Sequence, residues 1–414
     1  MKGSHVLLKL SLLSSLLLVA PGVFAEDNVT NRLDTYLSGL KQQELSYDYQ
    51  KNEAESSKLR DSWIMPITLK YSYKKSEPYG VEQTSENAAI VLDQPIFQSG
   101  GIYYGIKFAE ASRKYADYSI DQQRRMLIKE AISLLMQVKQ SGLRIERQNL
   151  QIANSNISLE QRQEEYLNGQ LDSGFLNNAI IETNLVTQTL YDIETNKERL
   201  VSKFQSLSDL DYTQAKIPYL RLVAEAEFLE NNIDLKLVES ETEKNRYNKN
   251  VTVAKYLPKV SLTASYNWDK YDRRSIGATQ TSGGAETDYS SYGFKASMPL
   301  DINTFRDVES AQVTYLKSKV VIDDRKRELK ALFEQVMQNL ENYDKKIKLA
   351  RENEALYAKL LSETKVLFEA GYKTSYEVEN LENSVKIQEI DRRIFEMDKQ
   401  LELLNLYEKL TDDV

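Results

Sequence analysis

Side chains that commonly carry out catalysis or bind metals are almost absent from this sequence. The chain has no Cys and a single His, His5, which lies in an N-terminal segment that we expect to be removed. Catalytic triads that use His, cysteine nucleophiles, zinc sites of the usual His/Cys type and disulfides are therefore excluded. Only carboxylate-based catalysis stays open, and we expect the protein to be no enzyme and to need no cofactor or metal.

The first 25 residues have the pattern of a secretory signal peptide. Lys2 precedes an apolar run at residues 10–20, and Val23-Phe24-Ala25 forms a small-residue cleavage box, so we expect the mature chain to begin at Glu26. Loss of Lys2 and Lys9 takes the formal net charge from -8 to -10, which argues against a nucleic-acid-binding protein. The mean hydropathy is -0.53 and no second apolar run reaches about 18 residues, which excludes a bundle of membrane-spanning helices.

The elements that must position any functional groups are mainly long helices. From residue 304 to residue 370 there is neither Pro nor Gly, and apolar residues recur every seven positions. Such heptads keep apolar groups facing a neighbour when helices supercoil, and a helix of this length is ~100 Å long. The seam consists of Leu329, Phe333, Val336, Leu340, Tyr343, Ile347, Ala350, Tyr357, Leu361 and Phe368. Shorter seams occur at 138–159 and 387–404.

Four other segments alternate between apolar and polar residues with a period of two, which is typical of β-strands. They begin near Ile67, Ala88, Val260 and Tyr292, and we expect strands of about ten residues. The strands pair as two hairpins with polar loops at roughly 76–86 and 272–288. A half-exposed sheet in water and tilted strands in a bilayer both fit this pattern. Tyr and Trp near the strand ends fit an aromatic girdle and ordinary strand propensity equally well.

The same order of elements occurs twice along the chain. Pro66 and Pro258 each follow a Leu by 21 residues, and the turn Tyr166-Leu-Asn-Gly169 matches Phe368-Glu-Ala-Gly371. We therefore expect a duplication behind the signal peptide at 1–25. The first repeat covers 26–217, with a strand hairpin at 64–97 and a helix turn near 169–174. The second covers 218–414, with a hairpin at 257–300 and a turn near 371–375.

In the order and spacing of its motifs, the chain resembles the TolC family of outer-membrane efflux proteins, the outer-membrane factors. The motifs are Tyr256-Leu-Pro-Lys-Val-Ser-Leu-Thr-Ala-Ser-Tyr266, Gln94-Pro-Ile-Phe-Gln-Ser-Gly-Gly101, and Phe368-Glu-Ala-Gly371 followed by Tyr376-Glu-Val-Glu-Asn380. The resemblance implies an α+β membrane protein, a homotrimer in which each protomer gives four strands to one 12-stranded outer-membrane β-barrel. A long α-helical coiled-coil barrel would continue it. Four strands cannot close a membrane barrel alone, and an open edge in lipid leaves backbone groups unpaired. If the strands lie in a membrane, an oligomer is therefore also expected on physical grounds.

This resemblance further implies a function and a place in the cell. The trimer would be the outer-membrane exit duct of a tripartite efflux or type I secretion system, exporting small molecules or proteins. Its helical part would lie in the periplasm. Its partners would be a periplasmic adaptor (membrane fusion) protein, an inner-membrane transporter of the RND or ABC type, and outer-membrane lipid, with no nucleic acid.

The resemblance also implies a gated tunnel entrance at the turn after Gly371. In the family a basic residue follows this Gly by two positions and acidic residues follow it by six and nine. Here these positions hold Lys373, Glu377 and Asn380, so one carboxylate has become an amide. Phe368 before this turn and Asp172 in the first turn complete the expected gate. Alternatively, Lys373 and Glu377 form an ordinary surface pair worth roughly a few tenths of a kcal/mol.

If the strands cross a membrane, their alternation assigns each side chain to lipid or to a water-filled lumen. We expect Ile67, Leu69, Tyr71, Val260, Leu262, Ala264, Phe294 and Ala296 to face lipid. We expect Lys70, Ser72, Lys259, Ser261, Thr263 and Lys295 to face the lumen.

Two other classes of protein share some of these features. A periplasmic scaffold or adaptor with long coiled-coil hairpins would have the heptads and the export signal, but it would not need two amphipathic strand hairpins of membrane length. An extracytoplasmic carboxylate hydrolase would need two acids that converge in a cleft, and long thin helices offer few clefts. The sequence therefore favours the outer-membrane duct.

Overall fold

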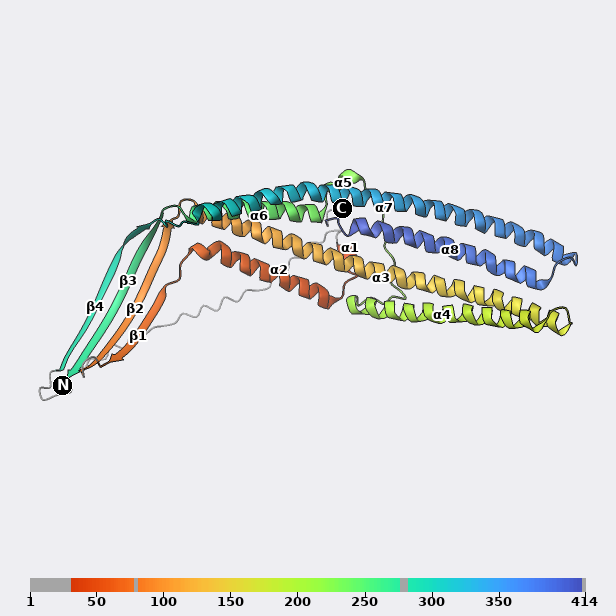
Figure 1. Ribbon diagram of the computed structural model, residues 1–414, viewed down its shortest axis with the longest axis horizontal. Helices are drawn as coiled ribbons and strands as arrows, with labels where there is room; N and C mark the ends of the chain where they lie inside the picture. The colour runs from red at the N-terminus through yellow and green to blue at the C-terminus, as the bar shows by residue number, and fades with distance from the viewer. Residues whose placement is uncertain (1–30, 78–80, 276–281, 412–414) are drawn as a thin grey trace.

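The computed structural model describes residues 31–77, 81–275 and 282–411. The expected signal peptide and its cleavage site lie outside the described residues. Figure 1 shows an elongated molecule with a four-stranded sheet at one end and helices that run from it to two helical tips at the other end. The chain is thus mainly helical with one antiparallel sheet, which confirms the coarse fold class.

The helices and strands follow one another in an order that the two halves of the chain share. They are α1 Asn31–Asp34, α2 Gly39–Arg60, the 3-10 helix η1 Asp61–Trp63, β1 Thr68–Ser76, β2 Val81–Phe97, α3 Gly101–Leu167, α4 Ser173–Leu207, α5 Glu225–Glu230, α6 Ile233–Lys255, β3 Lys259–Ser275, β4 Ser282–Ser297, α7 Thr304–Glu369 and α8 Ser375–Tyr407.

Two helices, α3 with 67 residues and α7 with 66, run through most of the molecule. The long helix expected from the heptads at 304–370 is therefore confirmed. Each is accompanied by two shorter helices placed end to end, α4 and α2 beside α3, and α8 and α6 beside α7 (Figure 1). The Ser38 amide donates to the Leu207 carbonyl (2.8 Å) at the first junction, and the Ile233 amide donates to the Lys409 carbonyl (2.8 Å) at the second. The helices around α3 and those around α7 are thus arranged in the same way. This likeness supports the duplication, which remains a prediction.

The main hydrophobic core lies at mid-length, where these junctions and the connecting segment after α4 surround α3 and α7. Phe228 of α5 packs against Phe333 of α7 with ring centroids 5.6 Å apart. The Leu220 amide of the connecting segment donates to Gln400 Oε1 of α8 (2.8 Å). Towards the tips the seam becomes less covered: Leu329 and Val336 are buried, whereas Phe368 is exposed. Among the described helices, none combines the length and the apolar character needed to cross a membrane.

The four strands form one antiparallel sheet in the order β1-β2-β3-β4. The two expected hairpins are present. The expected length of about ten residues fits β1, which has 9, but was wrong for β2 and β3, which have 17, and for β4, which has 16. Much of the expected loops at 76–86 and 272–288 is strand. Polar residues there pair across the strands, as Lys75 does with Glu82 (2.9 Å) and Lys270 with Glu86 (3.6 Å). The polar composition of these segments therefore led to an overestimate of the loop lengths.

Candidate functional site

The strand register divides the sheet into an apolar and a polar face. Directly opposed residues of antiparallel strands point to the same face. Leu69 lies opposite Ile90, which lies opposite Tyr266, and Leu262 lies opposite Phe294. The strand residues expected to face lipid share this apolar face: Leu69, Tyr71, Val260, Leu262, Ala264, Phe294 and Ala296. Ile67 precedes β1 and is exposed.

The opposite face is polar and holds Lys70, Ser72, Lys259, Ser261, Thr263 and Lys295. Cross-strand contacts join its members: Lys295 lies 3.6 Å from Asp93 as an ion pair, and the Asn87 amide donates to Asp269. Such a sheet can separate an apolar medium on one side from water on the other. Contact of the apolar face with lipid, and of the polar face with a water-filled lumen, remains a prediction.

The outer elements of the chain lack neighbours on one side within the described part of the molecule. β1 and β4 are the edges of the sheet, and α4 and α7 are the ends of the helix row α4-α3-α8-α7 (Figure 1). Both end helices carry exposed apolar side chains, including Ile181 and Leu185 on α4 and Leu349 and Leu356 on α7. A sheet edge and a helix edge thus stand open on each side of the chain.

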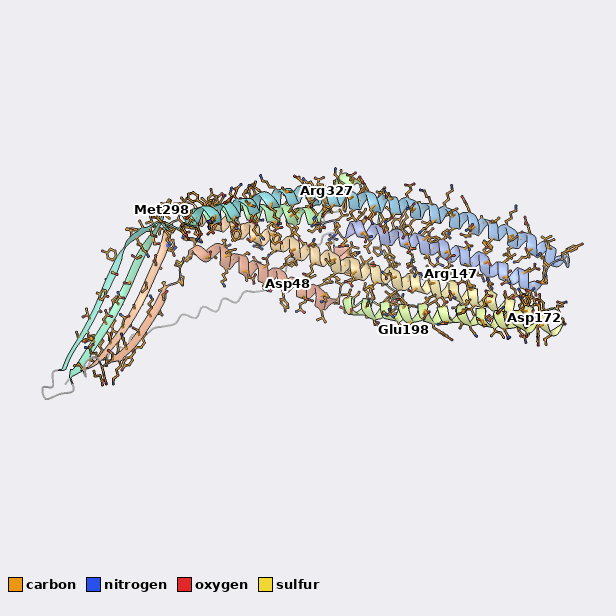
Figure 2. All side chains as sticks on the ribbon, in the orientation of Figure 1. Asp48, Arg147, Asp172, Glu198, Met298 and Arg327 are labelled. Carbon is orange, nitrogen blue, oxygen red and sulfur yellow. The ribbon has the colours of Figure 1, made fainter. Side chains whose placement is uncertain are left out.

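At the far end of the molecule, both helix hairpins turn in the same way. Asp172 marks one tip, at the opposite end from Met298 beside the sheet (Figure 2). Gly169 (φ 71°) and Gly371 (φ 79°) adopt the left-handed conformation that favours glycine. At each tip the Gly amide bonds the carbonyl three residues back and the next amide bonds the carbonyl five residues back, which is a Schellman motif. The two Gly turns expected near 169–174 and 371–375 are therefore alike in backbone geometry.

Lys373 and Glu377, two of the expected gate residues, are held together at the start of α8. The Lys373 ammonium pairs with Glu377 Oε1, while Glu377 Oε2 accepts from the Thr374 amide (2.9 Å). The Glu377 amide donates back to Thr374 Oγ1 (3.3 Å), which completes a capping box. The hydrogen bond from Lys373 lowers the pKa of Glu377 below its ordinary value of 4.5. The contacts of Glu377 with Lys373 and Thr374 therefore stabilise the start of α8.

The other expected gate residues lie around the same end but are not brought into this cluster by any described contact. Asp172 Oδ1 accepts from the Gly174 amide (2.7 Å) and caps α4. The Asn380 carbonyl lies 3.5 Å from Asn154 Nδ2 of α3, and Phe368 is exposed at the end of α7. Lys373, one of the expected gate residues, lies just before α8 and pairs with Glu377 in the first turn of that helix.

A link between the two hairpins is made by residues that sequence reasoning missed. The Tyr376 hydroxyl of α8 donates to Glu164 Oε1 of α3 (2.9 Å), and this hydrogen bond raises the pKa of Tyr376. No local pattern indicates the contact, because it depends on how α3 and α8 are aligned. By contrast, Thr374 and Glu377 fit the [ST]-x-x-[DE] capping pattern, so their capping box could have been predicted.

Further polar contacts join α3 to α8 at intervals of about two helical turns. Gln140 Nε2 donates to Asp398 (2.6 Å), Arg147 pairs with Asp391 (2.8 Å), and Asn383 Nδ2 donates to Asn154 (2.8 Å). Arg147 lies between mid-length and the tip in Figure 2. The seven-residue spacing of Gln140, Arg147 and Asn154 places them on one side of α3. The two hairpins are thus joined by polar contacts that ordered water can replace.

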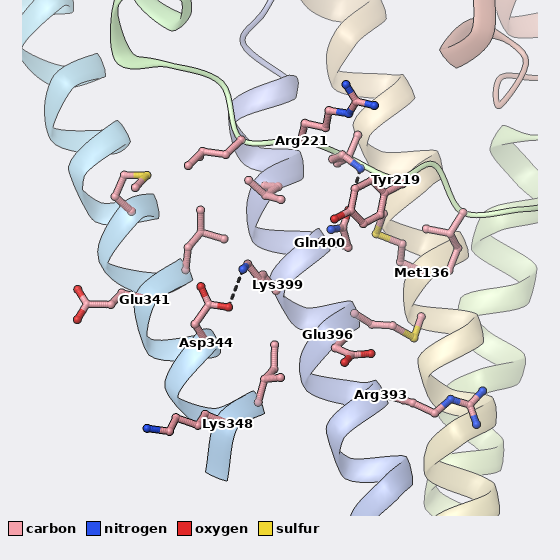
Figure 3. Close-up of a pocket in the computed structure, with 18 of the residues that line it drawn as sticks. Met136, Tyr219, Arg221, Glu341, Asp344, Lys348, Arg393, Glu396, Lys399 and Gln400 are labelled. Atoms are coloured by element: carbon pink, nitrogen blue, oxygen red, sulfur yellow. Dashed lines mark hydrogen bonds and ion pairs between the residues drawn. The ribbon is translucent and has the colours of Figure 1, made fainter. Parts of the chain in front are cut away.

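A groove of about 1170 Å³ lies between α7, α8 and the connecting segment around Tyr219 (Figure 3). Each of its acids is paired with a cation: Asp344 with Lys399 (2.6 Å) and Glu396 with Arg351 (3.5 Å) across helices, and Glu341 with Lys345 (2.7 Å) of its own helix. Two carboxylates working together on a substrate, as in a hydrolase, would have to give up these partners. Among the described residues, no group of three His, Cys, Asp or Glu side chains is placed to hold a metal.

Comparisons with known proteins agree with this geometry. Residues 225–408 match the protein family described as "Outer membrane efflux protein". No curated protein sequence gives a significant match. The fold is similar to that of the outer membrane protein VceC of Vibrio cholerae, at 13% identity and a TM-score of 0.68, over 92% of this chain and 96% of that one. It is also similar to the CmeC outer membrane channel of Campylobacter jejuni, at 12% identity and a TM-score of 0.70, over 93% and 87% of the two chains. For the MtrE outer membrane channel of Neisseria gonorrhoeae the values are 10%, 0.62, 92% and 89%.

Proposed function

We propose that this chain, whose residues 225–408 match the outer membrane efflux protein family, is the outer-membrane exit duct of a tripartite efflux or type I secretion system. The observation that carries the proposal is the open sheet with one apolar and one polar face. In lipid, the unpaired backbone groups of β1 and β4 would cost several kcal/mol each, so the edges must be closed by other copies.

Three copies close the sheet into an even number of strands, 12 in all, as bacterial barrels require. A head-to-tail ring places β4 of one copy beside β1 of the next, and α7 of the same copy beside α4 of the next. The exposed apolar residues on α4 and α7 support this arrangement, because the ring would bury both sets at once. The helices would then continue the barrel as a tunnel.

The duct would span the outer membrane with its sheet and the periplasm with its helices. The tips, with Phe368, Lys373, Glu377, Asn380 and Asp172, would form the entrance, and the polar face of the sheet would line the exit. A periplasmic adaptor and an inner-membrane transporter of the RND or ABC type would deliver the cargo. A tunnel lined by mixed polar groups suits small molecules or proteins that pass without tight binding.

Fractionation of cells that produce the full chain tests this proposal. The protein should remain with the outer membrane, require detergent for extraction and migrate differently on a gel before and after boiling, as a barrel does. Recovery in the soluble periplasmic fraction, with one mobility throughout, would contradict the duct and favour the coiled-coil scaffold.

A further inference from the structure

The apolar face of β4 continues beyond the last residue of the strand. Tyr292, Phe294 and Ala296 alternate on this face within β4. The alternation then runs through Met298, Leu300 and Ile302, with Pro299 and Asp301 between them. Leu300 and Ile302 are both 92% exposed and Phe305, in the first turn of α7, is 85% exposed, whereas Met298 is 53% exposed. These four residues, the 298–305 patch, are an unusually exposed apolar group at the end of the sheet that joins the helices.

The backbone of this segment is held in a defined turn. Asp301 Oδ1 accepts from the Asn303 amide (2.8 Å), and the Asp301 carbonyl accepts from both the amide (3.1 Å) and the hydroxyl (2.7 Å) of Thr304. The polar residues Asp301, Asn303 and Thr304 thus form the hydrogen bonds of the turn that begins α7. The apolar side chains of Leu300 and Ile302 are left on the outside. Met298 lies where the sheet meets the helices (Figure 2).

The apolar band of the sheet is shorter than the apolar band of a membrane barrel, which indicates what the 298–305 patch would contact. On β3 the apolar face runs from Trp268 to Val260, which is ~26 Å along the strand at ~3.3 Å per residue. A strand tilt of about 40° reduces this to ~20 Å, whereas the apolar band of an outer-membrane barrel is about 25 Å tall. Beyond Trp268 the next residues of this face are Lys270 and Asp272, so the band cannot be extended at that end. It can be extended only at the end where the 298–305 patch lies.

The neighbouring junctions provide apolar residues at the same end of the sheet. Ile64 and Ile67 precede β1, and Ile96 and Phe97 end β2, and all four are exposed. The apolar surface therefore extends past β1 as well as past β4, and it reaches the last residues of β2.

We propose that the 298–305 patch is a lipid anchor, in which Met298, Leu300, Ile302 and Phe305 enter the acyl-chain boundary of the periplasmic leaflet. This inference rests on the proposed function, since the sheet must lie in the outer membrane. The patch completes the apolar band that the strands leave too short, and it fixes the depth of the barrel relative to the start of α7. Its partner is the phospholipid surface, to which apolar side chains at the interface bind by burial of their area.

Spin labels at single cysteines test the anchor, because the chain has no native Cys. The full chain is reconstituted into vesicles of phosphatidylethanolamine and phosphatidylglycerol, with a label at Leu300→Cys or Ile302→Cys. Phe294→Cys, on the apolar face of β4, is the control for lipid, and Tyr372→Cys, 80% exposed at the helix tip far from the sheet, is the control for water. Collisions with dissolved oxygen report lipid, and collisions with a water-soluble nickel chelate report water.

Labels at 300 and 302 should collide mainly with oxygen, at a ratio of oxygen to nickel collisions within about twofold of that at 294 and at least tenfold above that at 372. A ratio like that at 372 would place the patch in water and overturn the anchor while leaving the barrel intact. Protection from both reagents would show that a neighbouring copy covers the patch, which also overturns the anchor. A water-like label at 294 would instead overturn the membrane sheet itself, and with it both proposals.

Discussion

The hydroxyl of Tyr376 in the first turn of α8 donates a 2.9 Å hydrogen bond to the carboxylate of Glu164 in the last turn of α3. This bond joins the tips of the two helix hairpins of the chain. Glu377 lies in the same turn of α8, but it forms the capping box of that helix with Thr374 and pairs with Lys373 just before the helix. The bond between Tyr376 and Glu164 therefore links the hairpins close to the expected entrance.

Removal of this hydroxyl should loosen the entrance. Tyr376→Phe keeps the ring but loses the hydrogen bond that joins the two tips. The variant should show a higher single-channel conductance in planar bilayers than the parent protein. Tyr372→Phe, at the exposed tip residue, is the matched control and should leave conductance unchanged. Equal conductance of Tyr376→Phe and the parent would show that the constriction lies elsewhere.

The charge of Glu377 can be separated from its capping role. Gln can accept the Thr374 amide as Glu does, so Glu377→Gln should keep the start of α8 while removing the carboxylate. In a trimer this removes a ring of three charges, and the preference for cations at low salt should weaken. The preference of the parent should itself fade as salt shortens the Debye length to about 10 Å at 0.1 M. Reversal potentials in a salt gradient measure both effects, and an unchanged potential for Glu377→Gln would mean that the pair is only surface charge.

The tip should lose protection in acid. Lys373 holds the pKa of Glu377 below its ordinary value of 4.5, so the folded tip favours the ionised carboxylate. This stabilisation is fully present above pH 4.5 and is lost as the pH falls through the lowered pKa. Hydrogen exchange, corrected for the intrinsic rate at each pH, should show weaker protection at the start of α8 at pH 3 than at pH 6. Glu377→Gln should show little difference between the two pH values, and an equal loss of protection in this variant would assign the effect to another group.

Adjacent residues on β3 should differ sharply in tolerance to charge. Leu262 lies on the apolar face opposite Phe294, and Thr263 lies on the polar face opposite Gly293. Leu262→Arg should cost about 2 to 4 kcal/mol if it lies near the bilayer midplane, whereas Thr263→Arg should cost little. The yield of heat-modifiable protein in the outer membrane measures this difference. Similar yields for the two variants would show that the apolar face does not contact lipid.

The sequence predicted the features that depend on local periodicity. The heptads at 304–370 predicted the long helix α7, the alternation at Val260 and Leu262 predicted strand β3, and Gly169 and Gly371 predicted the two turns. The family resemblance is confirmed by the matching domain at 225–408. The strand lengths were underestimated because Glu82 and Glu86 look like loop residues until their cross-strand pairing with Lys75 and Lys270 is known. The contact between Tyr376 and Glu164 could not be predicted, because it joins residues 212 positions apart through the alignment of two helices.

Closure of the sheet by three copies is the central claim, and cross-linking of its two edges tests it most directly. Ser72 on β1 and Ser297 at the end of β4 both belong to the polar face, so Ser72→Cys and Ser297→Cys together place one thiol near each edge of a chain that has no other Cys. Membranes treated with a short bifunctional thiol reagent should yield species of one, two and three copies and nothing larger, with neither single variant giving the three-copy species. A ladder that continues beyond three copies, or a protein of the outer membrane that stays a single copy throughout, would contradict the trimeric duct.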